Sequence, residues 1–448
     1  MTLIRFFIIS FHLFEQMLRY AFFRTGYALF VWDREKLRAK VERLRALCFT
    51  DFFRNLGATF IKIGQILSSR PDILPEYIID ELKLLQDQVP PFDFVHVEQT
   101  FKEDFGKGVD EVFEKINREP IAAASIAQVH EAWLSDGRHA AVKVRRPDIE
   151  RGMERDLSVL LGLAWVFDRL PYLNVLRLSP QVESFGEAIR AQLDFTREAE
   201  NNRRFDKHLK EMEFVHFPEI YDDYCTGRII TMEFVTGKKL DEVLVDPPIE
   251  RPVLAERLFD FYSEMIYGHQ FIHADLHPGN VLIDERGHFT LLDTGLVVEM
   301  PKYYVKRFLR LVLATATMDG AILLKTYLED REGEPLSPET LAEAETEALE
   351  ISKQFQGKTV AELEFGKIIF EMFALLRKYH IWMERELTMM FVSDITVEGM
   401  AKALDPDFDM PSFFQRKGMK YIAKMDWLKP EDFVFKFYQQ PSNSPSGS

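Results

Sequence analysis

The sequence has few cysteines, no net positive charge and no long uninterrupted apolar run. Its two cysteines, Cys48 and Cys225, lie far apart and in no metal-ligand spacing, which argues against a disulfide framework or a zinc site and fits a reducing cytoplasm. The formal charge of −16 argues against binding nucleic acid by general electrostatics. We therefore expect a cytoplasmic protein with no nucleic-acid partner.

The apolar segments are too short to span a bilayer. Glu15 and Arg19 interrupt the first, which is rich in phenylalanine, and Asp168, Arg169 and Pro171 interrupt the second. A spanning helix needs about 20 predominantly apolar residues. The sequence predicts no transmembrane helix.

Residues 1–34 nevertheless have an unusual pattern. Placed on a helix, Arg5, His12, Gln16 and Arg19 form a thin polar stripe on an otherwise apolar cylinder. Two interpretations stay open: a helix in peripheral contact with the inner face of a membrane, or a helix packed on the rest of the protein.

The remaining periodicity predicts an α+β chain, in which a small sheet lobe precedes a large helical one. Helical patterns cover residues 35–90, the segment from Ile149 to Asn202 and most of residues 301–403. Alternating apolar residues on either side of Asp136-Gly137 predict a β-hairpin, since Asp-Gly is a strong hairpin signal. Residues 228–235 form a further predicted strand, and a second predicted hairpin follows Asn280.

Lys143 stands inside an apolar strand, in AAVKV. Its ammonium group needs a partner if the strand is buried, and a phosphate together with a carboxylate would provide one. The run Ala122, Ala123, Ala124 and Ser125 precedes the hairpin. Small residues there let backbone amides approach a phosphate, or simply form a tightly packed turn.

The stretch HADLHPGN supplies the strongest chemical signal. Protein kinases use H-R-D-L-x-x-x-N, where the aspartate orients the attacking hydroxyl group and the asparagine binds magnesium. Asp275 and Asn280 keep this offset of five residues, and Asp293 follows thirteen residues later in LLDTG, at the position of the kinase D-F-G aspartate. Asn280 and Asp293 offer the oxygen ligands that Mg²⁺ prefers. His273 and His277 are interpreted as residues that brace this loop by hydrogen bonding.

A carboxylate partner for Lys143 should come from the helix that begins near Gln192. Glu198 and Glu200 are both candidates, with Asp194 on the same face as Glu198. The pattern by itself does not choose between them.

Together these segments resemble the UbiB-type atypical kinases, also called AarF-domain proteins, which are linked to ubiquinone and other isoprenoid-quinone metabolism. The resemblance covers roughly residues 35–410. It is carried by FIKIGQILSSRPDILPEYIIDELKLLQDQVPPF, with its K-x-G-Q signature, and by AAASIAQVHEA, LDFTREAENN, HADLHPGN, LLDTG and ALDPDFDM.

The resemblance implies a protein-kinase-like two-lobe fold with a helical N-terminal extension packed over the active site. The implied organisation is an amphipathic helix region (1–34), the K-x-G-Q extension (35–118), a sheet lobe with inserted helices (119–236), a helical lobe (237–435) and a disordered tail (436–448).

The implied cofactors are ATP or ADP and Mg²⁺, and the implied roles fall on individual residues. Lys143 would contact the nucleotide phosphates and Asp275 would act as the catalytic-loop aspartate, while Asn280 and Asp293 would hold magnesium. The alanine-rich loop from Ala122 to Ser125, Glu198 as the partner of Lys143, and the hinge of Glu233 and Val235 would complete the nucleotide site. Lys62, Gly64 and Gln65 form the signature that obstructs protein substrates in this family.

Two features depart from the family pattern. Gln192 stands where the family usually has the glutamate of an E-x-D motif, and the chain has a polar tail where quinone-biosynthesis members often have transmembrane helices. The expected partners are a nucleotide and, by resemblance, isoprenoid lipids or quinone-biosynthesis proteins, together with a peripheral membrane contact.

The expected function is that of a slow Mg-dependent kinase or ATPase supporting isoprenoid-quinone or lipid metabolism. Two alternatives stay open. A small-molecule kinase of the aminoglycoside or choline type shares HxDLHPGN but lacks the K-x-G-Q helix and the alanine loop. A non-catalytic nucleotide- or lipid-binding module would not need the complete set of Lys143, Asp275, Asn280 and Asp293.

Replacing Ala123 with glycine tests the alanine loop. Alanine adopts positive φ only with difficulty, so the native loop should be stiff and favour slow ATP hydrolysis over phosphorylation of protein. We expect Ala123→Gly to change nucleotide preference and autophosphorylation, measured side by side with the wild type. Unchanged values would count against the hypothesis.

Overall fold

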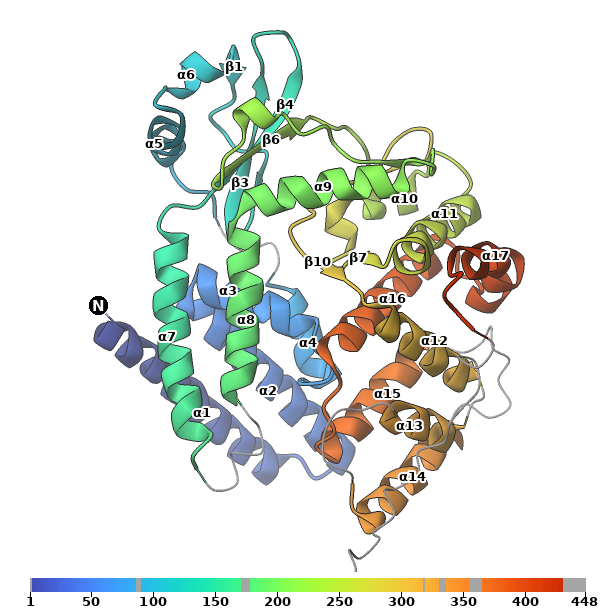
Figure 1. Ribbon diagram of the computed structural model, residues 1–448. Coiled ribbons are helices and arrows are strands. Elements are labelled where there is room, and N and C mark those ends of the chain that lie inside the picture. Colours follow the sequence, from blue (N-terminus) through green and yellow to red (C-terminus); the bar gives the residue numbers. More distant parts are fainter. Residues whose placement is uncertain are drawn as a thin grey trace, which may run out of the picture. The chain divides into compact units, whose positions relative to one another are not determined.

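A computed structural model (Figure 1) describes residues 2–85, 90–170, 178–316, 319–329, 336–353 and 365–429. The first helices and strands are α1 (Thr2–Phe30), α2 (Arg34–Leu56), α3 (Ala58–Ser68), α4 (Glu76–Lys83), α5 (Phe94–Phe105), α6 (Val109–Val112), β1 (Lys115–Ile116), β2 (Ala122–Ala123), β3 (Ala127–Trp133), β4 (His139–Arg145), α7 (Ile149–Phe167), α8 (Leu178–Leu193), α9 (Phe195–Leu209), β5 (Val215–His216) and β6 (Ile229–Glu233). The chain continues with α10 (Leu240–Val245), α11 (Arg251–Ser263), β7 (Phe271–His273), β8 (Val281–Ile283), β9 (Phe289–Leu291), β10 (Val297–Glu299), α12 (Lys302–Ala316), α13 (Gly320–Glu329), α14 (Pro338–Lys353), α15 (Phe365–Lys378), α16 (Arg385–Leu404) and α17 (Met410–Lys424).

The chain forms two compact units. Unit 1 comprises residues 1–207, 216–237 and 290–296, and unit 2 comprises residues 208–215, 238–289 and 297–448. The division crosses α9, β5 and β9 near their ends. The predicted tail, residues 436–448, lies outside the described residues.

The sheet of unit 1 has five strands, with β1, β3, β4 and β6 in that order and β2 paired to β3. The predicted hairpin is confirmed: β3 and β4 run antiparallel, with Val129 opposite Lys143. Gly137 closes the turn with φ of +88°, a conformation that glycine adopts without strain. The inward residues Val142 and Val144 pack into a core with Val97 and Phe101 of helix α5.

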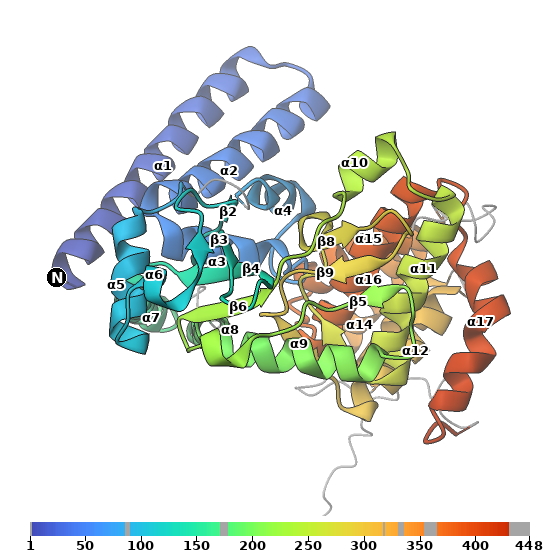
Figure 2. The same ribbon diagram turned by 90° about the horizontal axis from the view of Figure 1, so that it is seen from above.

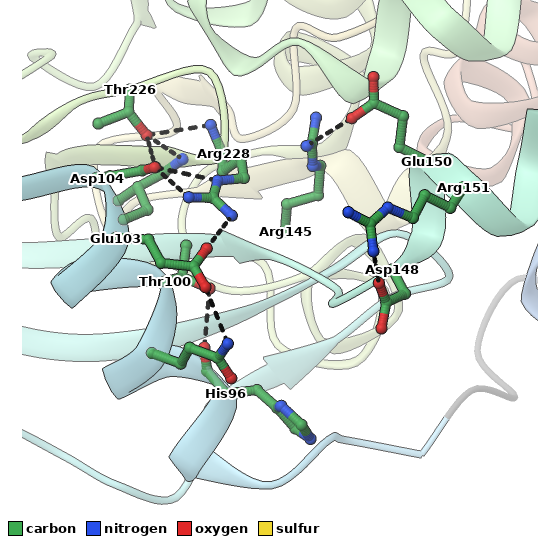
Figure 3. A network of polar contacts seen from close by, with 12 residues as sticks. His96, Thr100, Glu103, Asp104, Arg145, Asp148, Glu150, Arg151, Thr226 and Arg228 are labelled. Carbon is green, nitrogen blue, oxygen red and sulfur yellow. Dashed lines mark hydrogen bonds and ion pairs between the residues drawn. The ribbon is translucent and has the colours of Figure 1, made fainter.

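Polar contacts reinforce the packing of α5 on this sheet (Figure 3). The guanidinium group of Arg228, just before β6, donates to Glu103 and Asp104 at the end of α5. Thr226 Oγ1 donates to Asp104 as well, over 2.7 Å. The last turn of α5 is thereby fixed to the start of β6.

Helix α3 carries the K-x-G-Q residues and lies in the second core of unit 1. Its residues Phe60, Ile61, Ile63 and Leu67 are buried together with residues of α2, α4, α7 and α8. The helix ends at Ser68, shortly before Pro71, which cannot continue a helix. Pro75 is the N-cap of α4. The helical pattern between Ile149 and Asn202 is divided into α7, α8 and the first half of α9.

Unit 2 is mainly helical, with short strands beside its helices. Helix α11 packs on α16, and Tyr262 Oη donates to the carbonyl oxygen of Met390 over 3.0 Å. Helix α17 is held to α11 by Lys417, whose ammonium group donates to Asp260 over 2.9 Å. Strands β7 and β10 pair antiparallel, and β7 leads directly into the HADLHPGN loop.

Within unit 1, helix α1 packs on α2 and α7 through its polar stripe. Arg5 donates to the buried Asp156 of α7, and Arg19 donates to Asp51 of α2 over 2.7 Å. Gln16 is also buried. The helix is therefore packed on the protein, but its contact face is the polar one. Within the described residues, none of the helices has the length and apolarity required to cross a bilayer.

Gly64 allows α3 to approach its neighbours closely. A Cβ atom at this position would lie 2.8 Å from Leu85 Cδ1 and 3.4 Å from Leu82 Cδ2. We expect Gly64→Ala to lower the free energy of unfolding by about 1–3 kcal/mol, because the buried leucines must move to accommodate the methyl group.

Gly162 of α7 provides the matched control, because nothing lies within 4 Å of its added Cβ. Gly162→Ala should raise the free energy of unfolding by up to about 1 kcal/mol through helix propensity. Urea denaturation of both variants measures the difference, and equal effects would contradict the close-packing role of Gly64.

Candidate nucleotide site

Lys143 is the central residue of a buried charged cluster in unit 1. It lies on β4 between Val142 and Val144 and is 7% exposed. Its ammonium group donates to both carboxylate oxygens of Glu198, over 2.7 and 2.9 Å, and to Asp293 Oδ2 over 3.1 Å. It also lies 5.2 Å from the ring centroid of Phe195. Glu198 is thus the predicted carboxylate partner, and Asp293 provides a second carboxylate.

The structure decides which acid of α9 reaches Lys143. Glu198 is 4% exposed and faces the lysine, whereas Glu200 is exposed. Asp194 lies at the start of the helix, where its Oδ1 accepts from the N–H of Thr196 over 3.1 Å. Helical spacing leaves several acids possible, and only the packing of α9 beside β4 selects Glu198.

Asp293 is held by contacts that the sequence analysis did not predict. Its Oδ1 accepts from the N–H of Gly295 over 2.8 Å. Thr294 Oγ1 donates to the carbonyl oxygen of Glu198, and Asn201 Nδ2 donates to the carbonyl oxygen of Thr294. The threonine and the asparagine therefore fix the LLDTG segment to α9. Their only signal in the sequence is their place inside two of the family segments.

Burial and the neighbouring charges shift the pKa values of all three groups in the cluster. Burial raises the pKa of Glu198 to about 7, with Asp293 adding to the increase and Lys143 opposing it. Partial burial acts to raise the pKa of Asp293, but Lys143 and the N–H of Gly295 hold it well below its usual range. Burial acts to lower the pKa of Lys143, yet the two carboxylates raise it. One lysine thus faces two acids.

The alanine-rich loop lies next to the K-x-G-Q helix. Ala122 and Ala123 form β2, and the N–H of Ala124 donates to the carbonyl oxygen of Ala127 over 2.7 Å. Ser125 is buried, and its hydroxyl group donates to Gln65 Oε1 over 3.2 Å. Among the described residues, the non-glycine residues with positive φ are elsewhere, at Asp148, Gln270 and His380. The loop thus has a conformation that alanine adopts without strain.

Lys62 and Gln192 lie on neighbouring helices, α3 and α8, which pack against each other. Lys62 is half-buried, and its positive charge acts on both Glu198 and Asp293. Gln192 is buried, and its Nε2 atom has no hydrogen-bond partner among the described residues. The structure therefore brings the charge of Lys62 to the cluster, and it leaves the Gln192 amide unsatisfied.

The hinge residues continue from strand β6. The N–H of Glu233 donates to the carbonyl oxygen of Glu219, and that of Phe234 donates to the carbonyl oxygen of His139. Val235 follows the strand and is half-buried. Because the amide of Glu233 is already paired, a base contact through that group would require it to exchange partners.

In unit 2 the HADLHPGN loop is organised by its own polar groups. The N–H of Asp275 donates to His273 Nδ1 over 3.2 Å, and the N–H of Gly279 donates to His277 Nδ1 over 3.1 Å. Asn280 Nδ2 donates to the carbonyl oxygen of Asp275 over 3.0 Å. Both histidines brace the loop, as predicted. The convergence of Asp275 and Asn280 with the cluster of unit 1 stays a prediction.

Comparison with known proteins identifies the family of the chain. Residues 84–327 match the ABC1 atypical kinase-like domain, and residues 349–409 match the UbiB helical domain. The chain belongs to the ABC1 family of atypical kinase-like proteins.

Similar proteins include bacterial relatives named "Probable protein kinase UbiB". The one from Pseudomonas fluorescens is 29% identical over 83% of this chain and 71% of its own length. The one from Azotobacter vinelandii is 30% identical over 83% of this chain and 70% of its own length. Among solved structures, the complex of Rv3197 with erythromycin from Mycobacterium tuberculosis is 21% identical, with a TM-score of 0.48, over 85% of this chain and 100% of that one.

The family assignment confirms the predicted α+β, kinase-like fold. An ABC1 protein belongs with the phosphotransferase class, and its kinase-like fold implies a nucleotide site. Asp293 of unit 1 fits a magnesium ion that enters with phosphate, because 43% of its side chain is exposed and its pKa is held well below the usual range, which keeps the carboxylate charged. Within the described residues, no group of three or more His, Cys, Asp or Glu could hold a metal ion alone. Phosphate oxygens and water would have to complete the coordination.

The raised pKa of Glu198 predicts a pH dependence of stability. Between its unfolded value near 4.5 and its folded value of about 7, the unfolded state ionises first. The free energy of unfolding of the wild type should therefore fall relative to that of Glu198→Gln as the pH rises through this window. The fall should be no more than about 3 kcal/mol, with no further change above pH 7.

Glu200→Gln is the matched control, since Glu200 is an exposed acid of the same helix. Denaturation of the three proteins from pH 4 to pH 8 measures the effect. A difference between wild type and Glu198→Gln that stays constant with pH would show that Glu198 titrates normally.

Proposed function

We propose that the protein binds Mg–ATP or ADP and is a slow Mg-dependent kinase or ATPase. The observation that carries the proposal is the buried contact of Lys143 with Glu198 and Asp293. A lysine so deeply buried, and held by an acid from a helix, is in position to exchange one carboxylate contact for an anionic phosphate.

Each residue of the predicted nucleotide site has a distinct role in this proposal. Glu198 would orient Lys143 toward the phosphates. The loop from Ala122 to Ser125 would contact them, for which the N–H of Ala124 would have to exchange its partner, the carbonyl oxygen of Ala127. Asp293 and Asn280 would hold the magnesium ion, which when bound neutralises phosphate charge. Asp275 would orient the attacking hydroxyl group or water molecule. Glu233 and Val235 would receive the base.

The proposed context is isoprenoid-quinone or lipid metabolism. The UbiB names of the relatives and the resemblance of the K-x-G-Q segment support it. The Gln65–Ser125 hydrogen bond supports the accompanying proposal that α3 restricts access to the alanine loop, because it ties the signature directly to that loop. A protein acting on such lipids works at a membrane surface, and we propose a cytoplasmic protein peripheral to the inner face.

Two other functions predict different behaviour of the protein. A small-molecule kinase would transfer phosphate to a soluble alcohol, and the loop contact of α3 gives no support to that reading. A non-catalytic module would bind nucleotide without turnover. Measuring turnover and binding separately distinguishes the non-catalytic module from an enzyme.

Asp293→Asn is the decisive variant. The amide keeps the size of the side chain but removes the negative charge that would hold magnesium. We expect Mg-dependent ATP turnover to fall by at least about a hundredfold, as for loss of a principal electrostatic group. Turnover is measured by phosphate release, and calorimetry measures Mg–ATP binding.

Asp284→Asn serves as the control, because Asp284 lies in the turn between β8 and β9 and caps it locally. Its turnover should stay near that of the wild type. Absence of any heat of Mg–ATP binding by folded wild-type protein would overturn the proposal. For the metabolic context, cells lacking the protein should regain their quinone and prenyl-precursor profile with the wild type but not with Asp293→Asn.

A further inference from the structure

Helix α1 buries its polar side and exposes its apolar side, the reverse of an ordinary amphipathic helix. Its buried side carries Arg5, Ile9, Gln16 and Arg19. Arg5 is bound to Asp156 over 2.7 and 2.9 Å and to the carbonyl oxygen of Leu56 over 2.6 Å. These contacts fix which side of the helix faces unit 1.

The opposite side of α1 is apolar and exposed. Its large residues recur every three or four positions, which places them on one face: Leu3, Phe7, Phe11, Phe14, Leu18 and Phe22. Each of them is at least 55% exposed, and Phe22 reaches 75%. Helices α1 and α2 lie side by side (Figure 2), and α2 covers only the polar side.

A continuous apolar face of this length is rare on a monomeric protein and marks a contact with a partner or a membrane. The alternative, burying the phenylalanines and exposing the arginines, is the usual arrangement in water. Ion pairs with Asp156 and Asp51 hold the inverted arrangement, so the folded structure exposes the apolar face.

The charge around this face indicates what it contacts. The first 45 residues hold nine Lys or Arg and four Asp or Glu, and two of the cations, Arg5 and Arg19, are paired with Asp156 and Asp51. The remaining seven cations exceed the four acids by three, in a chain with a net charge of −16. The exposed basic residues gather at the end where α1 meets α2: Arg24, Arg34, Lys36, Arg38, Lys40 and Arg43. Trp32, in the connection between the helices, is 95% exposed, and tryptophan favours the interface between lipid and water.

We propose that α1 is a membrane-docking helix that lies in the plane of a bilayer rich in anionic phospholipid. Its phenylalanine face would enter the boundary between headgroups and acyl chains, and the basic residues of the α1–α2 end would contact the headgroup phosphates. This goes beyond the proposed nucleotide chemistry, because it names the surface and the class of lipid. It rests on α1 and α2 alone and not on the nucleotide site.

A second copy of the chain fits the same face less well. Parallel pairing of two α1 faces would bring the two basic α1–α2 segments together, and like charges oppose such contact. Antiparallel pairing would separate them but would leave the basic segments without an anionic partner. An anionic bilayer instead complements both the apolar and the basic parts of the surface.

Vesicle flotation tests the proposal with the full chain. We expect the wild type to float with vesicles of phosphatidylcholine and phosphatidylglycerol, and much less with phosphatidylcholine alone. The double variant Phe11→Glu, Leu18→Glu should lose at least about tenfold in partitioning, since two charges would enter the acyl boundary. Both positions are exposed, so folding should persist, as circular dichroism can verify.

The matched control is Val245→Glu, Met419→Glu, which places the same two charges at exposed apolar positions of α10 and α17. It should float like the wild type. The proposal is overturned if Phe11→Glu, Leu18→Glu floats equally well, or if the wild type binds neither vesicle. It is also overturned if sedimentation without vesicles shows a dimer that this variant dissociates. Mg–ATP calorimetry on the same variants keeps the result separate from the nucleotide site.

Discussion

The contact between Lys143 and Glu198 is the interaction on which the architecture of unit 1 depends. It joins a strand to a helix 55 residues away in the sequence, and Asp293, 150 residues from the lysine, completes it. An ammonium group on a buried strand is costly without a carboxylate. The position of α9 beside the sheet is therefore constrained by charge as well as by apolar packing.

This constraint also gives the site its electrostatic character. Burial raises the pKa of Glu198 to about 7, because a carboxylate removed from water loses hydration of its charged form, and the neighbouring Asp293 adds to the increase. The nearby Lys62 of α3 adds a second cation without a direct ion pair among the described residues. The K-x-G-Q helix thus contributes in two ways, through this charge and through the hydrogen bond of Gln65 with Ser125. Gly64 contributes by allowing close packing, a role separate from the chemistry of its neighbours.

Helix α1 shows the same preference for satisfying buried charge. Asp156 is almost completely buried on α7, and Arg5 supplies its cation. Arg5 and Arg19 face α7 and α2. Because of the helical period, the phenylalanines on the opposite side of α1 then face outward. The two ion pairs therefore account for the orientation that exposes the apolar face.

The sequence by itself determined what depends on neighbouring residues: the Asp136-Gly137 hairpin, the histidine-braced HADLHPGN loop and the polar stripe of α1. It also supplied the family segments that carry the kinase-like fold. Tertiary structure alone decided that Glu198 rather than Glu200 meets Lys143, that Thr294 and Asn201 secure Asp293, and that the stripe faces inward. Turns and helix faces follow from local dihedral angles and periodicity, whereas the choice among equivalent acids, or between two sides of a helix, is made by partners far away in the chain.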